Sequence, residues 1–259
     1  MYNFVFNLGA AIINLVNFFV GHSKFCIKVC VRGIIGSKFI NPAVNMAIVR
    51  QIYFAGVELF YIMTFISIVV GIAIVGELSK FLILVGAKES IGTVLLTVII
   101  RSAAPIITGL LLMLRTSTAI LMEVGLMKHN RELIALDAMN IDPYIYVYFP
   151  RILAGVISMV VLSTYFSLIS IMGGYILLSF QLDTTLDSIL GQVVYEINLS
   201  DVLSFLFQTV LIGFLIGSIP IYTAISTKGV QTDIIKSFVY GMIRLFLAFI
   251  LIVILGQII

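Results

Sequence analysis

Charged residues are scarce in this sequence. Only 10% of its 259 residues are Asp, Glu, Lys or Arg, while 61% are hydrophobic and the mean hydropathy is +1.22. Soluble domains carry about 25% charged and about 45–50% apolar residues. The composition therefore excludes an ordinary soluble domain and indicates a polytopic membrane protein. The net charge of +3 is too small and too dispersed along the chain to suggest a nucleic-acid partner.

Tryptophan is absent, and there are only two cysteines. Tyrosine must then supply the aromatic side chains at the membrane surface, where Trp and Tyr are normally enriched. Cys26 and Cys30 have only His22 nearby as a further ligand, which is too few for a metal site. A disulfide is not expected on a reducing face. We interpret both cysteines as unreactive thiols.

Nucleotide-binding and catalytic motifs are also missing. Residues 71–77 share only the glycines of a phosphate-binding loop, because they lack its Lys-Ser/Thr pair. His22 and His129 have no recognisable Ser or Cys nucleophile arranged around them. The first twenty residues lack the basic start and the Ala-x-Ala site of a signal peptide. We therefore expect no catalysis, metal or cofactor in this chain, so that a partner must supply any energy for transport.

Five apolar stretches have the length of about 20 residues that a transmembrane helix requires. We predict spans at about 57–76, 91–114, 152–180, 202–226 and 238–259. We divide the chain into an interfacial and elbow region, residues 1–50, and a five-span domain, residues 51–259. The first twenty residues carry asparagines on one helix face, which predicts an amphipathic helix lying in the membrane interface. Residues 21–50 have five basic residues and no acid, which is typical of a segment on anionic lipid.

Lysine and arginine are distributed unevenly between the two sides that these spans define. One side carries eleven and the other only two, and basic residues mark the cytoplasmic side. We therefore predict a cytoplasmic N-terminus and an outer C-terminus. The eleven are Lys24, Lys28, Arg32, Lys38, Arg50, Arg115, Lys128, Arg131, Arg151, Lys228 and Lys236, and the two are Lys80 and Lys88.

A polar island at residues 123–143 separates the second and third spans. Leu133, Leu136 and Met139 recur at helical spacing among charged residues, which predicts a water-facing helix over residues 128–139. Such a helix either rests on lipid headgroups or docks in a groove of a soluble partner. Spacing alone does not distinguish the two.

The end of the polar island predicts a tight corner. Asn140 stands where a helix C-terminus favours a residue that tolerates left-handed dihedral angles. Asp142 and Pro143 are typical of an N-cap followed by proline in the first helical turn. The chain is therefore expected to turn here and enter the third span.

Two arginines lie inside the predicted spans, Arg101 in the second and Arg244 in the fifth. A charge at mid-bilayer costs about 2.5–3.5 kcal/mol, so each should face a cavity or a partner. Each is either a structural arginine that snorkels or pairs with a carboxylate, or a ligand for the phosphate of an amphiphile. Pro105, four residues after Arg101, should loosen the helix locally.

Small residues mark two further places in the spans. Gly213 and Gly217 form a GxxxG pair, which we interpret as close helix packing within the chain, with a dimer contact as the alternative. Gly173 and Gly174 are expected to interrupt the outer half of the third span.

Several motifs resemble the permease subunits of Mla-type ABC transporters, which move phospholipid between membranes together with MCE-domain proteins. The resemblance covers roughly residues 40–259 and is most specific in the polar island. The residues that carry it are Val49 to Tyr53, Gly56 and Val57 before the first span; Arg101 and Pro105 of an Arg-Glu-Leu-Gly-Pro motif; Arg115 and Ser117 of a Gly-Arg-x-Gly-Ser motif; Glu123 to Lys128, Glu132, Ala135, Leu136, Met139, Asp142 and Pro143; Pro150 and Arg151; Gly173 and Gly174; and Lys228, Gly229 and Val230.

Two departures from the family pattern concern charge. Ser102 occupies the position of the motif's glutamate, and Phe249 that of an aspartate in the last span. We therefore expect Arg101 to lack a neighbouring carboxylate and to need another anion, for which a phospholipid phosphate would serve.

The resemblance implies an all-α membrane protein with an interfacial N-terminal helix, five spans and a cytoplasmic coupling helix at about 124–140. It implies a homodimer in the bacterial inner membrane with a lipid cavity between its protomers. The implied partners are an ABC ATPase that holds ATP and magnesium, an MCE-domain protein and a small cytoplasmic regulatory subunit.

The resemblance also implies the roles of particular residues. Those expected to couple to the ATPase are Glu123, Gly125, Met127, Lys128, Glu132, Leu136, Met139, Asp142 and Pro143, and those expected to bind substrate are Arg101, Arg115 and Arg244. Two alternatives remain open: a permease for another hydrophobic substrate such as a sterol, and a membrane scaffold that does not transport.

Overall fold

The computed structural model describes residues 2–36, 42–86, 96–181, 197–227 and 231–258, together with positions 94, 191 and 195. Every element in these ranges is helical, which confirms the all-α fold. In chain order they are α1 (Tyr2–Gly36), α2 (Pro42–Ala55), the 3₁₀ turn η1 (Val57–Leu59), α3 (Phe60–Val85), the π-helix η3 (Leu96–Ala103), α5 (Ala104–Leu112), the π-helix η4 (Met113–Ser117), α6 (Thr118–His129), α7 (Glu132–Ala138), the π-helix η5 (Tyr144–Tyr148), α8 (Phe149–Gln181), α10 (Leu199–Ser226) and α11 (Gln231–Ile258).

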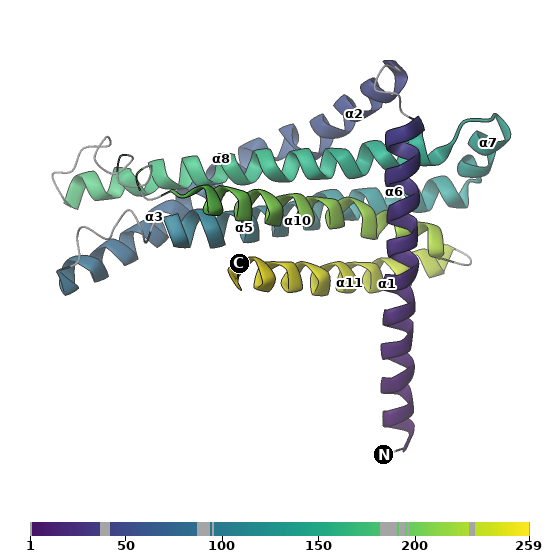
Figure 1. The fold of residues 1–259 in the computed structure, drawn as a ribbon, viewed down its shortest axis with the longest axis horizontal. Helices are drawn as coiled ribbons and strands as arrows, with labels where there is room; N and C mark the ends of the chain where they lie inside the picture. Colours follow the sequence, from purple (N-terminus) through teal and green to yellow (C-terminus); the bar gives the residue numbers. More distant parts are fainter. Residues whose placement is uncertain are drawn as a thin grey trace.

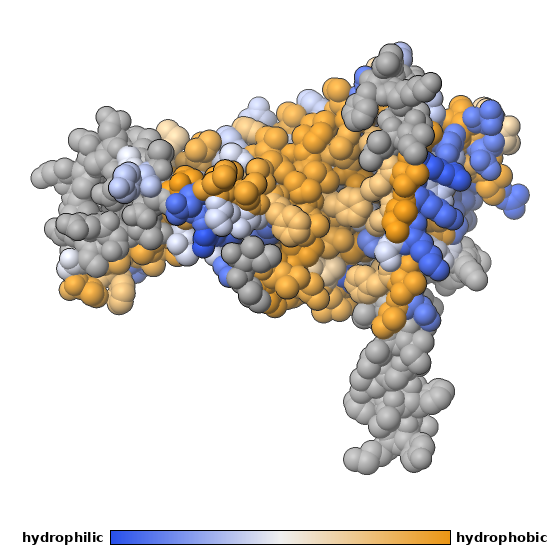
Figure 2. Space-filling view, in the orientation of Figure 1, coloured by the Kyte–Doolittle hydropathy of each residue, from blue (hydrophilic) through white to orange (hydrophobic). Residues whose placement is uncertain are grey.

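Five helical stretches of the described chain are long and apolar enough to cross a membrane, as predicted. They lie along a common direction, and hydrophobic side chains cover the middle of the visible face (Figures 1 and 2). The second stretch is longer than expected and continues to His129, because no Gly-Pro pair or cap interrupts it before the polar island. The five stretches are Val44–Leu82, Leu96–His129, Tyr144–Ile176, Leu199–Ser226 and Phe238–Gln257.

Helix α1 crosses the bundle close to the end that carries α7 (Figure 1). It is one helix over Tyr2–Gly36, whereas the sequence predicted a helix only over residues 1–20. Gly21 lies within it at a close approach to α10, since a Cβ there would lie 2.0 Å from the hydroxyl of Tyr222. The Nε2 atom of His22 is 3.0 Å from the Oγ of Ser218. These contacts fasten α1 across α10, so that α1 crosses the direction of the five membrane-length stretches. Its place in the membrane interface stays a prediction.

Glycines let α8 and α10 approach until backbone meets backbone. A Cβ on Gly213 would lie 2.7 Å from the Cα of Val156, and one on Gly217 would lie 2.7 Å from the Cα of Ile152. A Cβ on Gly155 would lie 2.9 Å from the carbonyl oxygen of Gly213. The GxxxG pair therefore serves packing within the chain.

The expected interruption at Gly173 and Gly174 is wrong, because α8 runs unbroken through both. These glycines instead admit α3: a Cβ on Gly173 would lie 3.1 Å from the Cα of Ile68, and one on Gly174 would lie 2.2 Å from Val75. A helix tolerates glycine where close packing against a neighbouring helix offsets the conformational entropy that glycine loses on folding.

The main apolar core lies where α3, α5, α8 and α10 meet. Phe166, which is 0% exposed, is among its largest fully buried side chains. Phe249 of α11, where the family resemblance led us to expect an aspartate, packs into the same core. Its other buried members are Leu59, Met63, Ala104, Leu112, Met159, Leu162, Phe205, Ile212 and Ile216.

Candidate functional site

The polar island forms a corner at the end of the bundle where hydrophilic side chains gather (Figure 2). Helix α6 ends at His129, Arg131 adopts left-handed dihedral angles (φ 59°), and α7 follows. The single helix predicted over residues 128–139 is therefore wrong. The reason is local: Asn130 ends α6, and its Nδ2 atom donates to the Oε1 atom of Glu132 at 3.1 Å.

The far side of the corner follows the sequence prediction. Asn140 is left-handed (φ 59°), and the backbone N–H of Tyr144 donates to the Oδ1 atom of Asp142 at 2.9 Å. Asp142 thus caps the helix that begins the third span, with Pro143 in its first turn.

Three polar contacts fasten the corner to the bundle. Asp142 pairs with Arg32 of α1 at 3.2 Å, and Glu123 pairs with Arg151 of α8 at 3.0 Å. The ammonium of Lys128 donates to the carbonyl oxygens of Ile225 and Thr227 at the C-terminus of α10. A cation is favourable at this end of a helix, because the last carbonyls have no partner within the helix.

Apolar contacts also hold α7 against the bundle. Leu133 and Leu136 pack on a buried cluster that includes Phe25 of α1, Tyr148 of η5 and Ile221 of α10. Helix α7 therefore packs on a cluster to which α1, α6, α8 and α10 all contribute.

The predicted coupling residues therefore divide into two groups. Glu132 and Met139 are exposed, while the other seven are buried or half-buried: Glu123, Gly125, Met127, Lys128, Leu136, Asp142 and Pro143. Ile134, which the sequence reasoning missed, is 67% exposed, similar to Met139 at 61%. The outward apolar surface of α7 thus consists of Ile134 and Met139 rather than Leu136 and Met139. A cavity of about 530 Å³ lies beside it, lined by residues that include Arg32, Lys128, Arg131, Asp137 and Tyr144.

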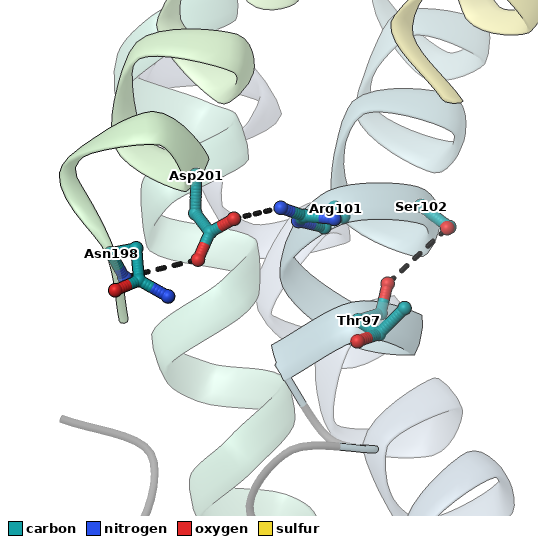
Figure 3. A network of polar contacts seen from close by, with 5 residues as sticks. All are labelled: Thr97, Arg101, Ser102, Asn198 and Asp201. Atoms are coloured by element: carbon teal, nitrogen blue, oxygen red, sulfur yellow. Dashed lines mark hydrogen bonds and ion pairs between the residues drawn. The ribbon is translucent and has the colours of Figure 1, made fainter. Parts of the chain in front are cut away.

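Arg101 has a carboxylate partner, so the expectation that it lacks one is wrong. Its guanidinium donates to Asp201 of α10 (Figure 3). The Asp201 side chain is 7% exposed and that of Arg101 43%. Asp201 lies in the first turn of α10, and Arg101 lies in the last turn of η3, which begins the second membrane-length stretch. The pair therefore lies toward the end of the bundle away from α7.

The backbone around Arg101 is held by α11. Gln257 donates from Nε2 to the carbonyl oxygen of Arg101 at 3.3 Å and accepts from the hydroxyl of Ser102 at 3.1 Å. The loosening predicted at Pro105 is present as the π-helix η3, which ends two residues before it. The second, fourth and fifth spans are thereby tied together at one end.

An apolar pocket of about 310 Å³ adjoins this network. It lies between η3, α8 and α10, and Asp201 is its only charged lining residue among those described. The other lining residues include Leu96, Ile100, Leu168 and Phe205. Its size and character suit a hydrocarbon chain.

The other two predicted substrate arginines have contacts within the chain. Arg115 donates to the carbonyl oxygen of Phe54 at 3.2 Å and pairs with Glu58, where α2 gives way to α3. Arg244 lies with its guanidinium carbon 4.1 Å from the centre of the Phe18 ring of α1, a cation–π contact. Both contacts explain the charges without a ligand.

Burial explains the chemistry of α1's remaining polar groups. It lowers the pKa of His22 to about 4, so the imidazole is neutral at physiological pH. It also raises the pKa of the Cys26 thiol to about 11 and that of Cys30, so neither forms a reactive thiolate. Both cysteines are free, in agreement with the sequence interpretation.

Comparison with known proteins decides the family. The family described as Permease MlaE matches residues 48–259. This chain belongs to the MlaE permease family. The match takes in all five membrane-length stretches except the first four residues of the first one. The polar corner also lies within it.

Individual relatives agree with this membership. A probable ABC transporter permease protein of Rickettsia felis is 27% identical over 197 residues, covering 75% of this chain and 76% of its own. The intermembrane phospholipid transport system permease protein MlaE of Haemophilus influenzae is 35% identical over 129 residues, 49% of each chain. A probable permease of Synechocystis is 27% identical over 160 residues, 62% of this chain and 61% of its own. The protein is accordingly a permease subunit of the ABC transporter class.

Two partners of the arginines, Asp201 and Glu58, were missed from the sequence. For Asp201 a signal existed: Asn198 and Asp201 have the spacing of a capping box, which places Asp201 in the first turn of a span. Because the second and fourth spans both start at the end of the bundle away from α7, Asp201 and Arg101 fall at the same level. The matching residues Lys228, Gly229 and Val230 lie outside the described residues.

Proposed function

We propose that this permease moves phospholipid between membranes, driven by ATP hydrolysis on a separate ABC ATPase subunit. The observation that carries the proposal is the α7 corner. It projects Ile134 and Met139 into water while Leu133, Leu136, Lys128 and Asp142 attach it to the bundle. A helix so placed can dock by its outer face and transmit displacement through its inner one.

Phospholipid as the substrate is supported by the Haemophilus influenzae relative, which is a phospholipid transport permease. It is also supported by the neighbourhood of Arg101, where a half-exposed guanidinium stands beside an apolar pocket. A lipid phosphate would bind the guanidinium of Arg101 beside Asp201 or in its place, and an acyl chain would enter the pocket. Of the three predicted arginines we retain Arg101 for this role, because it is exposed and its partner Asp201 lines the apolar pocket, whereas Arg115 and Arg244 are half-buried.

The wider assembly follows from the same resemblance. We propose a homodimer in the bacterial inner membrane with its N-terminus and α7 in the cytoplasm and its C-terminus outside. ATP and magnesium belong to the ATPase subunits. An MCE-domain protein on the outer side and a small cytoplasmic regulatory subunit complete the proposed complex.

The direct test is purification of the permease from its native membrane, followed by mass spectrometry of bound proteins and lipids. We expect an ABC ATPase and phospholipid, with ATP hydrolysis stimulated by lipid. An ATPase that co-purifies without lipid or lipid stimulation would favour a scaffold, and bound sterol would favour the alternative substrate. Absence of any ATPase would refute the proposal.

Arg101 can be tested separately from its ion pair. Arg101→Ala should reduce co-purified phospholipid, whereas Asp201→Asn frees the guanidinium and should leave bound phospholipid equal or increased. Arg101→Lys should restore only part of the binding, since an ammonium lacks the two-pronged donor geometry. Equal loss in Arg101→Ala and Asp201→Asn would show that the pair serves structure alone.

A further inference from the structure

Two side chains of the π-helix η4 donate hydrogen bonds to backbone carbonyls of other helices. Arg115 donates to the carbonyl oxygen of Phe54, next to the turn between α2 and α3. Ser117, at the end of η4, donates from its hydroxyl to the carbonyl oxygen of Ile216 in α10 at 2.9 Å. Ser117 is 0% exposed, so water does not replace this bond.

The carbonyl of Ile216 needs an outside donor because of Pro220. Pro220 lies inside α10, four residues after Ile216. In a regular helix the N–H of that residue would bond to the Ile216 carbonyl, but proline has no N–H and its ring crowds the same oxygen. The hydroxyl of Ser117 supplies the missing hydrogen bond.

The two parts of α10 on either side of this point have different polar attachments, although α8 packs along both. The outer part contacts α8 through Gly213 and carries in its first turn Asp201, which binds Arg101. The inner part ends at the carbonyls that Lys128 binds and contributes Ile221 to the cluster under α7. The missing backbone hydrogen bond thus lies between the half of α10 attached to the α7 corner and the half attached to the Arg101 network.

We propose that Ile216–Pro220 is a hinge in α10, and that Ser117 is the positioning residue that holds it. Displacement of α7 moves the inner part of α10 through Lys128, and the hinge sets how much of that movement reaches the outer part. A proline is the usual cause of a sharp helix kink, and the glycine at 217 lowers the steric resistance to bending. The inference rests on the proposed function, because it assigns the hinge a step in ATP-driven lipid transfer.

The test compares Ser117→Ala, Pro220→Ala and the double variant in proteoliposomes that contain the complete ATPase complex. Two quantities are measured: the melting temperature of the complex, and lipid transferred per ATP hydrolysed. Ser67→Ala is the matched control. Ser67 is equally buried, but its hydroxyl bonds to Met63 within its own helix, at a carbonyl that already has a backbone donor.

Ser117→Ala should lower the melting temperature, because it leaves the Ile216 carbonyl without a donor. In the Pro220→Ala background the new backbone N–H supplies that bond. Adding Ser117→Ala to that background should therefore lower the melting temperature only slightly. Pro220→Ala should assemble normally but lose about tenfold in lipid transferred per ATP, since the hinge is gone. The double variant should be stable and equally uncoupled, and Ser67→Ala should resemble the wild type in both measurements.

Each result bears on a separate part of the idea. An equal loss of melting temperature from Ser117→Ala in both backgrounds would overturn the pairing of Ser117 with the Pro220 interruption. Wild-type coupling in Pro220→Ala would overturn the hinge. If Ser117→Ala fails to assemble, recovery of assembly in the double variant supports the pairing, and no recovery refutes it. If the wild-type complex binds its ATPase but transfers no lipid, the proposed function fails, while the melting cycle still reports on Ser117.

Discussion

Asp201 accepts a hydrogen bond from the guanidinium of Arg101 and another, at 3.0 Å, from the backbone N–H of Asn198. One buried carboxylate thereby caps the start of α10 and binds a cation on the second span (Figure 3). The two functions are chemically separable, because an amide in place of the carboxylate can still accept from the backbone but carries no charge.

This arrangement predicts an asymmetric cost for removing the partners. Asp201→Ala should destabilise the protein more than Asp201→Asn does, by about 1 kcal/mol, because alanine also removes the cap. Arg101→Met should cost about 1–3 kcal/mol, since it leaves a nearly buried carboxylate without its cation. The double variant Arg101→Met with Asp201→Asn should lose less free energy of unfolding than the sum of the losses in the two single variants. Melting curves in detergent measure this cycle, and strict additivity would show that the pair contributes nothing.

The outer face of α7 predicts which substitutions detach the ATPase. Replacing Ile134 and Met139 with Asp should lower ATPase co-purification at least about tenfold while the permease stays folded, because both side chains point into water. Leu136→Asp should instead lower thermal stability, since Leu136 packs on the buried cluster. The matched control is Tyr195→Asp with Leu199→Asp, two exposed side chains at the other end. Wild-type ATPase yield from the Ile134 and Met139 double variant would contradict docking through α7.

The asymmetry of basic residues predicts the orientation of the protein. Single cysteines at Asn130 and at Tyr195, both exposed, should react with a membrane-impermeant maleimide from opposite sides. The background should carry Cys26→Ser and Cys30→Ser. Asn130 should label only in inside-out vesicles and Tyr195 only in spheroplasts. Labelling of both from one side would refute the topology with five spans.

The contact between α8 and α10 predicts low tolerance at its glycines. Gly213→Val should destabilise the protein by about 3 kcal/mol or more, because the added atoms would displace the Val156 backbone. Gly191→Ala is the control, since a Cβ there meets no atom of the described residues within 4 Å. Expression and melting temperature of the two variants measure the difference. A Gly213→Val protein as stable as the control would contradict the close packing.

The buried imidazole of His22 predicts a loss of stability in acid. Its pKa is near 4 in the folded protein and about 6.5 when unfolded, so the unfolded state binds more protons between these values. Stability should be constant above about pH 6.5 and fall as the pH drops toward 4. The charged or titratable groups beside it are Cys26, Tyr222 and, beyond Phe18, Arg244.

A neutral substitution separates this effect from other titrations. His22→Asn should have lower stability at pH 7, because the Ser218 contact is weakened, and a smaller difference between pH 7 and pH 4.5. Melting temperatures at the two pH values give the comparison. An unchanged pH dependence in His22→Asn would assign the acid sensitivity to another group.

Properties that depend on neighbouring residues followed from the sequence by itself. The five spans were predicted because a transmembrane helix requires about 20 contiguous apolar residues. Such a stretch can be recognised from consecutive residues alone. The left-handed Asn140 and the cap at Asp142 were predicted for the same reason, since caps are interactions over one to three residues. Family membership was predicted too, because the motifs of the polar island are continuous in the chain.

Only the tertiary structure decided which distant groups meet. Asp201 lies 100 residues from Arg101 and Glu58 lies 57 from Arg115, so no local pattern links either pair. The inward direction of Leu136 and the outward direction of Ile134 depend on how α7 rotates against α1 and α10, because both residues are equally apolar. The role of Ser117 depends on η4 lying against the turn of α10 where Pro220 has no N–H to donate to the Ile216 carbonyl. Hydrogen bonds and ion pairs between helices are set by packing, which the order of residues determines only through the whole fold.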